Sequence, residues 1–485
     1  MSTLSSLRPL RRSPSSQTIL MAAVVVLCAA GAAISGLGMS SGHKMQLVVP
    51  VALVLGAVVA VVAMTRFSVF LLLMLALRAS VDVSSLGSDS SSTGAAPMSD
   101  RFLTPSTLLA GVFLVAAALW LLAQVRAGTL RRGTGLRRAW VLFAVVGFVS
   151  MLGSADRTRT LVGAAQVLTI VLMYVVLEQV MADVRTRNRL LAAVYVSAVV
   201  PLLYTMAGLA LGHPNAEVKD GFTRLMGTFT QSNVYGRYLM LLILFGVAVY
   251  VHVPKRWRLW LLSLLSLSAV FLALTYTLTA IFGTALGLVV LGIWHNRKIL
   301  VGLVVAGLCV LVVAPQLVAR VESVTSSTSY YADNHHANSL TWRFSYWRDV
   351  LPLADADPVT GIGLNMTGAD TTQDKQPHND FLRAYVEEGL LGEAAYLILL
   401  LSLVTMGVRA ARASPRGSLD RGIAMGYLAC VVALAAGSTS DNIFTNVAVL
   451  WYLVAFAAAA SNVAQRHRPA VDRAGELTPT GGVAG

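Results

Sequence analysis

The polar segment SLTWRFSYWRDVLPLADADPVTGIGLNM (residues 339–366) and its continuation QPHNDFLRAYVEEGLLG (376–392) interrupt a chain that otherwise consists mainly of apolar runs. Only 12% of the 485 residues are charged, yet this segment contains Arg343, Arg348, His378, Asp380 and Arg383. Charged groups are costly next to lipid, so their concentration here requires a reason. We predict that this segment covers an active site.

The rest of the chain predicts a membrane protein. Apolar residues make up 56% of it, the mean hydropathy is +0.70, and apolar runs recur along its length. A helix needs about 20 apolar residues to cross the hydrocarbon core. We therefore predict an all-α, polytopic transmembrane helix bundle of about 12–14 spans. The expected spans are 18–39, two short spans within 45–80, 104–125, 138–155, 160–181, 189–212, 236–252, 258–274, 277–294, 299–318, 387–409, 421–438 and 443–461.

The polar segments divide the chain into four parts. We expect a cytoplasmic tail at 1–17, N-terminal membrane spans at 18–212, a second membrane domain at 213–462 and a disordered cytoplasmic tail at 463–485. The second domain includes a large outer loop, 319–385, in which we expect short helices. The basic tail and the first apolar run also suit a signal peptide, but the run is long for one, which favours a retained span.

The distribution of basic residues predicts the orientation. With the N-terminus in the cytoplasm, most of the 37 Lys and Arg residues fall in cytoplasmic turns such as RAGTLRRGTGLRR (126–138). Outer loops such as DVSSLGSDSSSTGAAPMSD (82–100) lack basic residues. Both termini are then cytoplasmic, and 213–235 and 319–385 lie on the outer face of the cytoplasmic membrane. The net charge of +14 is spread over short turns next to membrane lipids, which excludes a nucleic-acid partner.

Outer arginines do not help topology, so they are candidates for ligand binding. Arg343 precedes Trp347 by four residues, which on a helix places a cation beside an aromatic ring. Arg224 lies shortly before the next span, and we expect both arginines to bind an anion. Arg383 has the spacing of a structural pair with Glu387. The other outer arginines of this kind are Arg237 and Arg348, and Arg348 is equally consistent with a solvated loop position beside Asp349.

His378 is the candidate general base. Pro377 before it, with Asn379 and Asp380 after it, indicates the start of a helix. The positive end of that helix should lower the pKa of His378 and favour the neutral imidazole, which accepts a proton.

No metal site or cofactor is expected from the sequence. His335 and His336 lie in a Ser/Asn-rich stretch without the carboxylate spacing of a metal site. The three cysteines fall inside apolar runs, which indicates packing roles.

Four stretches resemble the O-antigen ligase and O-antigen polymerase superfamily. RLMGTFTQSNVYGRYL (224–239) is similar to an arginine-led family segment, and TWRFSYWRDVLPLADADPVTGIG (341–363) to the family's R-x-x-x-W and G-x-G segment. PHNDFLRAYVEEGLLG (377–392) resembles its histidine motif, in which ten residues separate His378 from Gly389. STSDNIFTNVAVLWYL (438–453) is similar to its last span. The resemblance covers roughly residues 224–453.

The resemblance implies a membrane glycosyltransferase with a C-type fold. Such an enzyme moves a glycan from a polyprenyl-pyrophosphate donor, such as undecaprenyl pyrophosphate, to an acceptor hydroxyl without a metal. It implies His378 as the base and Arg224 and Arg343 as ligands of the pyrophosphate. Further substrate contacts are expected from Arg237, Arg348, Trp347, Tyr346, Asn379, Tyr385 and Arg78.

One departure from the family concerns a tight turn between two spans. Relatives often carry a Ser-Arg pair there, whereas this chain has Thr277 and Leu278. If that arginine holds the donor phosphate in relatives, Arg237, Arg348 or Arg78 is expected to replace it here.

The sequence is consistent with several functions. A surface polysaccharide polymerase and a ligase both fit these motifs, because they differ only in the glycan or lipid-linked acceptor. A peptidoglycan-type polymerase would need an outer carboxylate, for which Asp441 is a candidate. A flippase or transporter of lipid-linked glycans would predict polar groups at mid-membrane and an internal repeat of spans, and neither is visible in the sequence.

Overall fold

The computed structural model describes residues 61–81, 105–219, 221–313, 315–324, 339–371, 375–444 and 446–467. The predicted N-terminal tail, the first span, His335, His336 and residues 468–485 of the predicted C-terminal tail lie outside these residues. Residues 463–466, expected at the start of that tail, belong instead to the last helix, α19 (Val447–Arg466). The chain falls into two units, 1–73 and 74–485. The boundary crosses α3 (Phe67–Arg78), an apolar helix that ends in Arg78. The other helices and the hairpin belong to the second unit.

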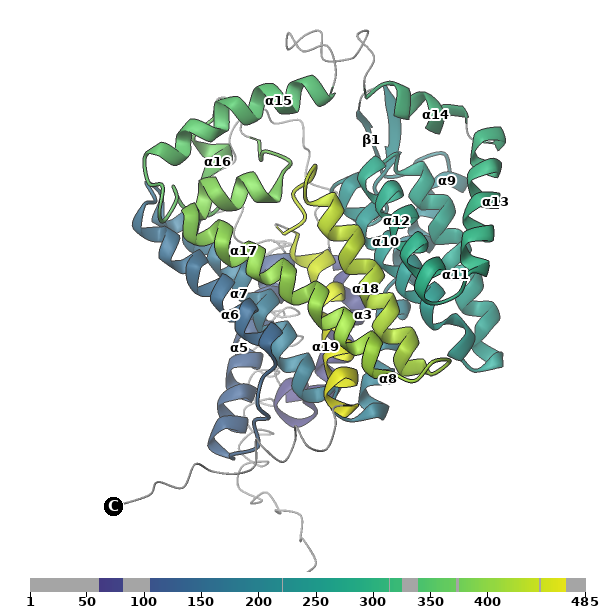
Figure 1. Cartoon of the computed structure of the whole chain (residues 1–485), viewed down its shortest axis with the longest axis horizontal. Helices are drawn as coiled ribbons and strands as arrows, with labels where there is room; N and C mark the ends of the chain where they lie inside the picture. Colours follow the sequence, from purple (N-terminus) through teal and green to yellow (C-terminus); the bar gives the residue numbers. More distant parts are fainter. Residues whose placement is uncertain are drawn as a thin grey trace, which may run out of the picture. The chain divides into compact units, whose positions relative to one another are not determined.

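The described part of the chain is helical, apart from one short hairpin (Figure 1). Nine of its helical segments are long and apolar enough to cross a membrane, which confirms a polytopic membrane helix bundle. They consist of α5 (Pro105–Arg126), α6 (Gly135–Val149) with η2 (Ser150–Leu152), α7 (Arg157–Val180), α8 (Val184–Val196) with α9 (Val199–Ala210), α10 (Ser232–Val249) with η3 (Tyr250–His252), α11 (Lys255–Leu274), α17 (Asp380–Ala413), α18 (Leu419–Gly437) and α19 (Val447–Arg466). Shorter apolar helices are α12 (Leu278–Trp294) and α13 (Lys298–Val313).

The most enclosed helix of this unit is α19, which is buried on all sides from Ala448 to Val463. It packs against α7, α10, α17 and α18. Its run of alanines lets neighbouring backbones come close, as is typical of helix contacts within membranes. Around it, α18 also packs against α10, α12 and α17.

Local sequence explains where several helices begin. The side chains of Asp156, Asp183, Ser418 and Asn446 each accept a hydrogen bond from the amide three residues later. Such caps satisfy backbone amides that have no partner within the helix. Most predicted spans begin and end within a few residues of the observed helices.

Two segments have a structure that differs from the predicted one. The insert at 213–233, expected as a loop, contains an antiparallel hairpin of β1 (Ala216–Lys219) and β2 (Phe222–Leu225), in which Glu217 pairs with Arg224. The single span expected at 299–318 consists of α13 and a separate helix, α14 (Pro315–Glu322). Proline suits the first turn of a new helix and disrupts the interior of a continuous one.

The long polar segment forms a small layer with its own core. It contains α15 (Ser339–Val350), η5 (Leu351–Asp355) and α16 (Met366–Ala369), which confirms the short helices expected there. Trp342, Tyr346, Ile362 and Val386 form a buried cluster that joins this layer to the first turns of α17.

A break in α17 fixes the polar layer to the membrane helices. At Gly389 the backbone leaves the helical conformation, with φ 68° and ψ −164°. Residues 358–363 insert at this break and pair with the backbone groups that it frees. The four hydrogen bonds run from Ile362 N to Val386 O (3.1 Å), Gly363 N to Glu387 O (2.9 Å), Leu390 N to Pro358 O (2.9 Å) and Leu391 N to Val359 O (3.3 Å).

Glycine is required on both sides of this contact. A Cβ at Gly389 would lie 2.3 Å from the carbonyl oxygen of Val359, and one at Gly361 would lie 2.4 Å from that of Glu387. Both glycines also have a positive φ, which other residues adopt only with strain.

We predict that Gly389→Ala lowers the free energy of unfolding by roughly 2–5 kcal/mol, because left-handed strain and overlap with Val359 add together. Unfolding of the purified protein in detergent or bicelles measures this value.

Two alanine variants serve as controls. Gly128 has φ 64° in open space, so Gly128→Ala isolates the strain and should cost about 1 kcal/mol. Gly302, within α13, also faces open space, and Gly302→Ala should be neutral or slightly stabilising. Equal effects of Gly389→Ala and Gly128→Ala would contradict the close packing at the break.

Candidate active site

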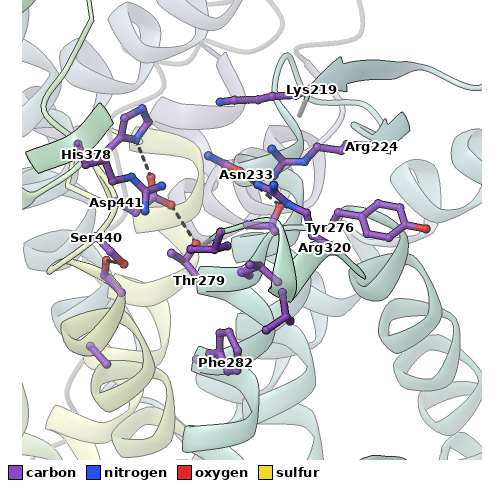
Figure 2. Close-up of a pocket in the computed structure, with 18 of the residues that line it drawn as sticks. Lys219, Arg224, Asn233, Tyr276, Thr279, Phe282, Arg320, His378, Ser440 and Asp441 are labelled. Carbon is purple, nitrogen blue, oxygen red and sulfur yellow. Dashed lines mark hydrogen bonds and ion pairs between the residues drawn. The ribbon is translucent and has the colours of Figure 1, made fainter. Parts of the chain in front are cut away.

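A cavity of about 710 Å³ opens where the hairpin, the α11–α12 turn, α14, α15 and the start of α17 meet the turn between α18 and α19 (Figure 2). One part of its wall is polar and largely basic, and another part is apolar. The polar wall includes Lys219, Arg224, Asn233, Tyr276, Thr277, Thr279, Arg320, Glu322, Arg343, His378, Ser440 and Asp441. The apolar wall, along α12 and α18, includes Leu278, Phe282, Gly283, Leu286, Ala436 and Gly437.

Asp441 is the central charged group of this wall, and only 2% of it is exposed. Arg237 Nε lies 3.3 Å from its Oδ2, and His378 Nδ1 lies 3.5 Å from its Oδ1. Thr279 Oγ1 and the amide of Asn442 also donate to it, at 3.3 and 2.9 Å. Burial alone would raise the pKa of Asp441, but Arg237 and His378 outweigh burial and hold the pKa well below its usual range. Asp441 is therefore an anion that bridges α10 and the start of α17.

His378 precedes α17 in a strained conformation, with φ 50°. The helix begins at Asp380 and is capped by Asn379, which confirms the predicted helix start. Directly before His378, the carbonyl of Pro377 accepts a hydrogen bond from the indole of Trp347 at 2.6 Å. Non-glycine residues with positive φ persist where their surroundings enforce them, often at functional sites.

The surroundings of His378 favour its neutral form. Burial lowers its pKa below the ordinary value of 6.5, and the charges of Arg343 and Lys219 lower it further, while Asp441 opposes this shift. The lowered pKa has the direction that the sequence predicted, but its largest cause is burial of the imidazole and not the positive end of the helix. With Nδ1 facing Asp441, Nε2 is the nitrogen that remains for a substrate.

Arg224 is anchored at the cavity by three neutral acceptors. Its Nε donates to Thr275 O at 2.9 Å, and its Nη2 donates to Asn233 Oδ1 and Thr277 Oγ1 at 2.7 and 3.1 Å. The guanidinium is therefore fixed in place before any ligand arrives. Arg343 reaches the same cavity from α15, so two predicted anion ligands and the predicted base line one space.

Arg237 lies behind the wall. Besides Asp441, it contacts the backbone carbonyls of Asn442 (2.9 Å) and Asn233 (3.1 Å), and only 4% of it is exposed. These contacts orient Asp441.

The other predicted substrate contacts lie away from the described cavity wall. Tyr346 is buried in the cluster of the polar layer, where its hydroxyl contacts Thr371 and the carbonyl of Lys375, and Tyr385 packs against that cluster. Arg348 is exposed on α15, and Arg78 is buried at the end of α3.

The geometry adds residues that the sequence-based argument did not select. Lys219, Tyr276, Arg320 and Trp342 all line the cavity. Lys219 and Arg320 carry the same signal that singled out Arg224, a cation in a predicted outer segment, so extending that argument would have found them. Trp342 lies with its ring centroid 6.0 Å from that of His378. Among the described residues, no group of His, Cys, Asp and Glu suits a metal ion.

Comparison with known families finds a match to the family described as O-antigen ligase over residues 263–397. The matched segment runs from α11 into α17 and contains Arg320, Arg343 and His378. Arg224, Arg237 and Asp441 lie outside it. No curated protein matches the sequence.

We predict that Arg237→Gln and Asp441→Asn each lower the free energy of unfolding by about 3–5 kcal/mol, because each leaves the partner buried without its main contact. The double variant should lose less than the sum of the two, by about 0.5–3 kcal/mol. A double-mutant cycle on the purified protein measures this coupling, and strictly additive losses would show that the two side chains do not interact.

Proposed function

We propose that this multi-pass membrane protein, whose residues 263–397 form an O-antigen ligase family domain, transfers a glycan from a polyprenyl-pyrophosphate donor to an acceptor hydroxyl. The observation that carries this proposal is the shared cavity. A neutral histidine, oriented by a buried carboxylate, faces the same space as Arg224 and Arg343.

The two walls of the cavity suit the two ends of such a donor. Arg224 and Arg343 supply positive charge for the pyrophosphate, whose negative charge grows as the sugar leaves. Phe282 and Leu286 of α12, with Ala436 of α18, provide an apolar surface for the polyprenyl chain. The donor is thus an amphiphile whose head lies at the polar wall, with its chain along the membrane helices.

The reaction follows from the position of His378. The acceptor oxygen forms a bond to the anomeric carbon while the bond from that carbon to the pyrophosphate oxygen breaks. The electron pair leaves with the pyrophosphate, and the hydroxyl proton moves to Nε2 of His378. Asp441 then stabilises the imidazolium. This sequence needs only a base and cations, so the proposal is a metal-independent transfer.

We assign the cavity to the outer face of the membrane and both termini to the cytoplasm. The basic residues Arg137, Lys255, Arg258 and Arg421 lie near the beginnings of α6, α11 and α18. The cavity lies at the opposite ends of α11 and α18. Basic residues favour the cytoplasmic side, which supports this orientation.

The contacts of Asp441 favour His378 as the base. A peptidoglycan-type polymerase would use an available carboxylate, whereas Asp441 is engaged by Arg237 and has a low pKa. The acceptor is a surface glycan or a lipid-linked glycan, which corresponds to a ligase or a polymerase.

We predict that His378→Ala and Arg343→Ala, produced at wild-type membrane levels in a strain lacking the gene, accumulate lipid-linked glycan and lose the finished polymer. General-base catalysis contributes about 10²–10⁴-fold to rate, so His378→Ala should leave at most traces of product.

The matched control is Arg416→Ala, which removes an exposed arginine from the turn between α17 and α18. It should make normal polymer. A wild-type amount of polymer from His378→Ala would show that His378 is not the base.

The dependence of kcat/KM on pH tests the same base. His378 must be neutral, so activity should fall as the pH drops through its folded-state pKa, which lies below 6.5. Lys219→Ala should shift this acid limb to higher pH, because the charge of Lys219 lowers the pKa of His378, and Asp441→Asn should shift it to lower pH. The limb should not move in Arg416→Ala, and opposite shifts in the site variants would contradict the assignment.

A further inference from the structure

A second cavity, of about 480 Å³, is formed by α8, the end of α10, η3 and the first turns of α11 and α18. The candidate active site lies at the other ends of α11 and α18, and the two cavities share no lining residue. We call this second cavity the α8–α11 groove. The proposed transfer reaction gives it no role.

The α8–α11 groove is mainly apolar. Leu191 and Tyr195 of α8 and Phe245 of α10 are among its lining residues. Two of these side chains are fixed by their packing: the ring of Phe245 stacks on that of Phe456 of α19 with 3.8 Å between centroids, and the hydroxyl of Tyr195 donates to Leu242 O at 3.2 Å. The groove is therefore a preformed apolar space, which suits a hydrocarbon chain.

Two tryptophans indicate the depth at which the groove meets the membrane. Trp257 and Trp260 of α11 line it, although 52% and 39% of their surfaces are exposed. Exposed tryptophans are enriched at the level of the lipid head groups, where one side of the indole is wet and the other is apolar. The groove thus opens at the level where a phospholipid changes from head group to acyl chain.

The opening carries positive charge. Lys255 and Arg256 are exposed in the first turn of α11, which contains no acidic residue, and the guanidinium carbon of Arg256 lies 5.9 Å from the ring centroid of Trp257. The positive end of a helix disfavours cations, so a bound anion would stabilise this turn. Asp420, at the start of α18, pairs instead with Arg187 at 2.8 Å. The opening therefore complements an anionic head group.

His252 adds a polar group to the lining of the groove. Its Nε2 is enclosed and has no hydrogen-bond partner among the described residues. The ring packs against α18, where a Cβ on Gly422 would lie 3.2 Å from its Cδ2. Arg258 holds the turn after His252, because its guanidinium donates to Val251 O at 2.6 Å and to Val253 O at 2.9 Å. An enclosed nitrogen without a partner costs free energy, which an oxygen of a ligand would recover.

We propose that the α8–α11 groove binds an anionic phospholipid from the membrane leaflet opposite the candidate active site. One acyl chain lies along Phe245, the phosphate lies at Lys255 and Arg256, and Nε2 of His252 donates to a phosphate or ester oxygen. A zwitterionic lipid has the same chains and phosphate, but the cations at the opening repel its positive group. The bound lipid contacts α8, α11 and α18 together and stabilises the folded protein. This inference does not depend on the proposed function.

The test is native mass spectrometry of the full-length protein, released from detergent micelles to which phosphatidylglycerol or phosphatidylcholine is added. The wild type should bind phosphatidylglycerol at least about 10-fold more tightly. Replacing both Lys255→Gln and Arg256→Gln should weaken phosphatidylglycerol binding roughly 10–30-fold and change phosphatidylcholine binding little. His252→Phe, which keeps a ring and removes the nitrogens, should weaken binding of both lipids about 3–10-fold.

Matched controls separate the groove from general surface effects. Arg297→Gln with Lys298→Gln removes two exposed cations at the start of α13, at the same end of the bundle but outside the groove, and should bind phosphatidylglycerol as wild type does. Ala192→Phe fills the groove from an exposed position on α8 and should weaken binding of both lipids about 10-fold or more. Ala306→Phe, exposed on α13, should have no effect.

The outcomes are distinct. Weaker phosphatidylglycerol binding in the Lys255/Arg256 variant, with wild-type binding in the Arg297/Lys298 variant, supports the lipid site. Equal affinity of the wild type for the two lipids, or equal losses in the two charge variants, overturns it. A lipid-free dimer that is lost in Ala192→Phe also overturns it, because the groove would then join two copies of the chain. Thermal unfolding identifies any variant that fails to fold, and the charge variants, at exposed positions, then decide.

Discussion

Three segments that are distant in the sequence meet at the buried carboxylate of Asp441. It joins Arg237 of α10, His378 before α17 and Thr279 at the start of α12. A buried carboxylate is stable only when such partners compensate for its lost hydration. In the reaction that we propose, the same partners serve the chemistry, because the carboxylate orients the imidazole while Arg237 keeps the carboxylate ionised. The proposed catalysis and the packing of α10, α12, α17 and α19 thus depend on one ion.

The polar layer reaches this ion through backbone contacts. The break at Gly389 lets residues 358–363 bond to both sides of α17, and the indole of Trp347 holds the carbonyl before His378. The layer brings Arg343 to the cavity from α15. Tyr346, which was expected to contact the substrate, instead forms part of the core of the layer.

Sequence alone predicted the helix bundle well, because apolar periodicity and length are local signals. It also predicted the helix start at His378 and the Arg383–Glu387 pair, which the structure contains at 2.9 Å. The hairpin was missed, since its strands are only four residues each. The link between Arg237 and Asp441 spans 204 positions, and no local pattern records such a contact. Residues such as Arg320 gain significance only when folding places them beside the cavity.

The central claim is that the cavity beside Asp441 holds the pyrophosphate of the donor. The most direct measurement is a cryo-electron microscopy map of His378→Ala in lipid nanodiscs with a bound polyprenyl-pyrophosphate glycan. We expect pyrophosphate density between Arg224 and Arg343, a sugar next to position 378 and the lipid chain along Phe282. Density for the head group at another place in the molecule, with this cavity empty, would contradict the account.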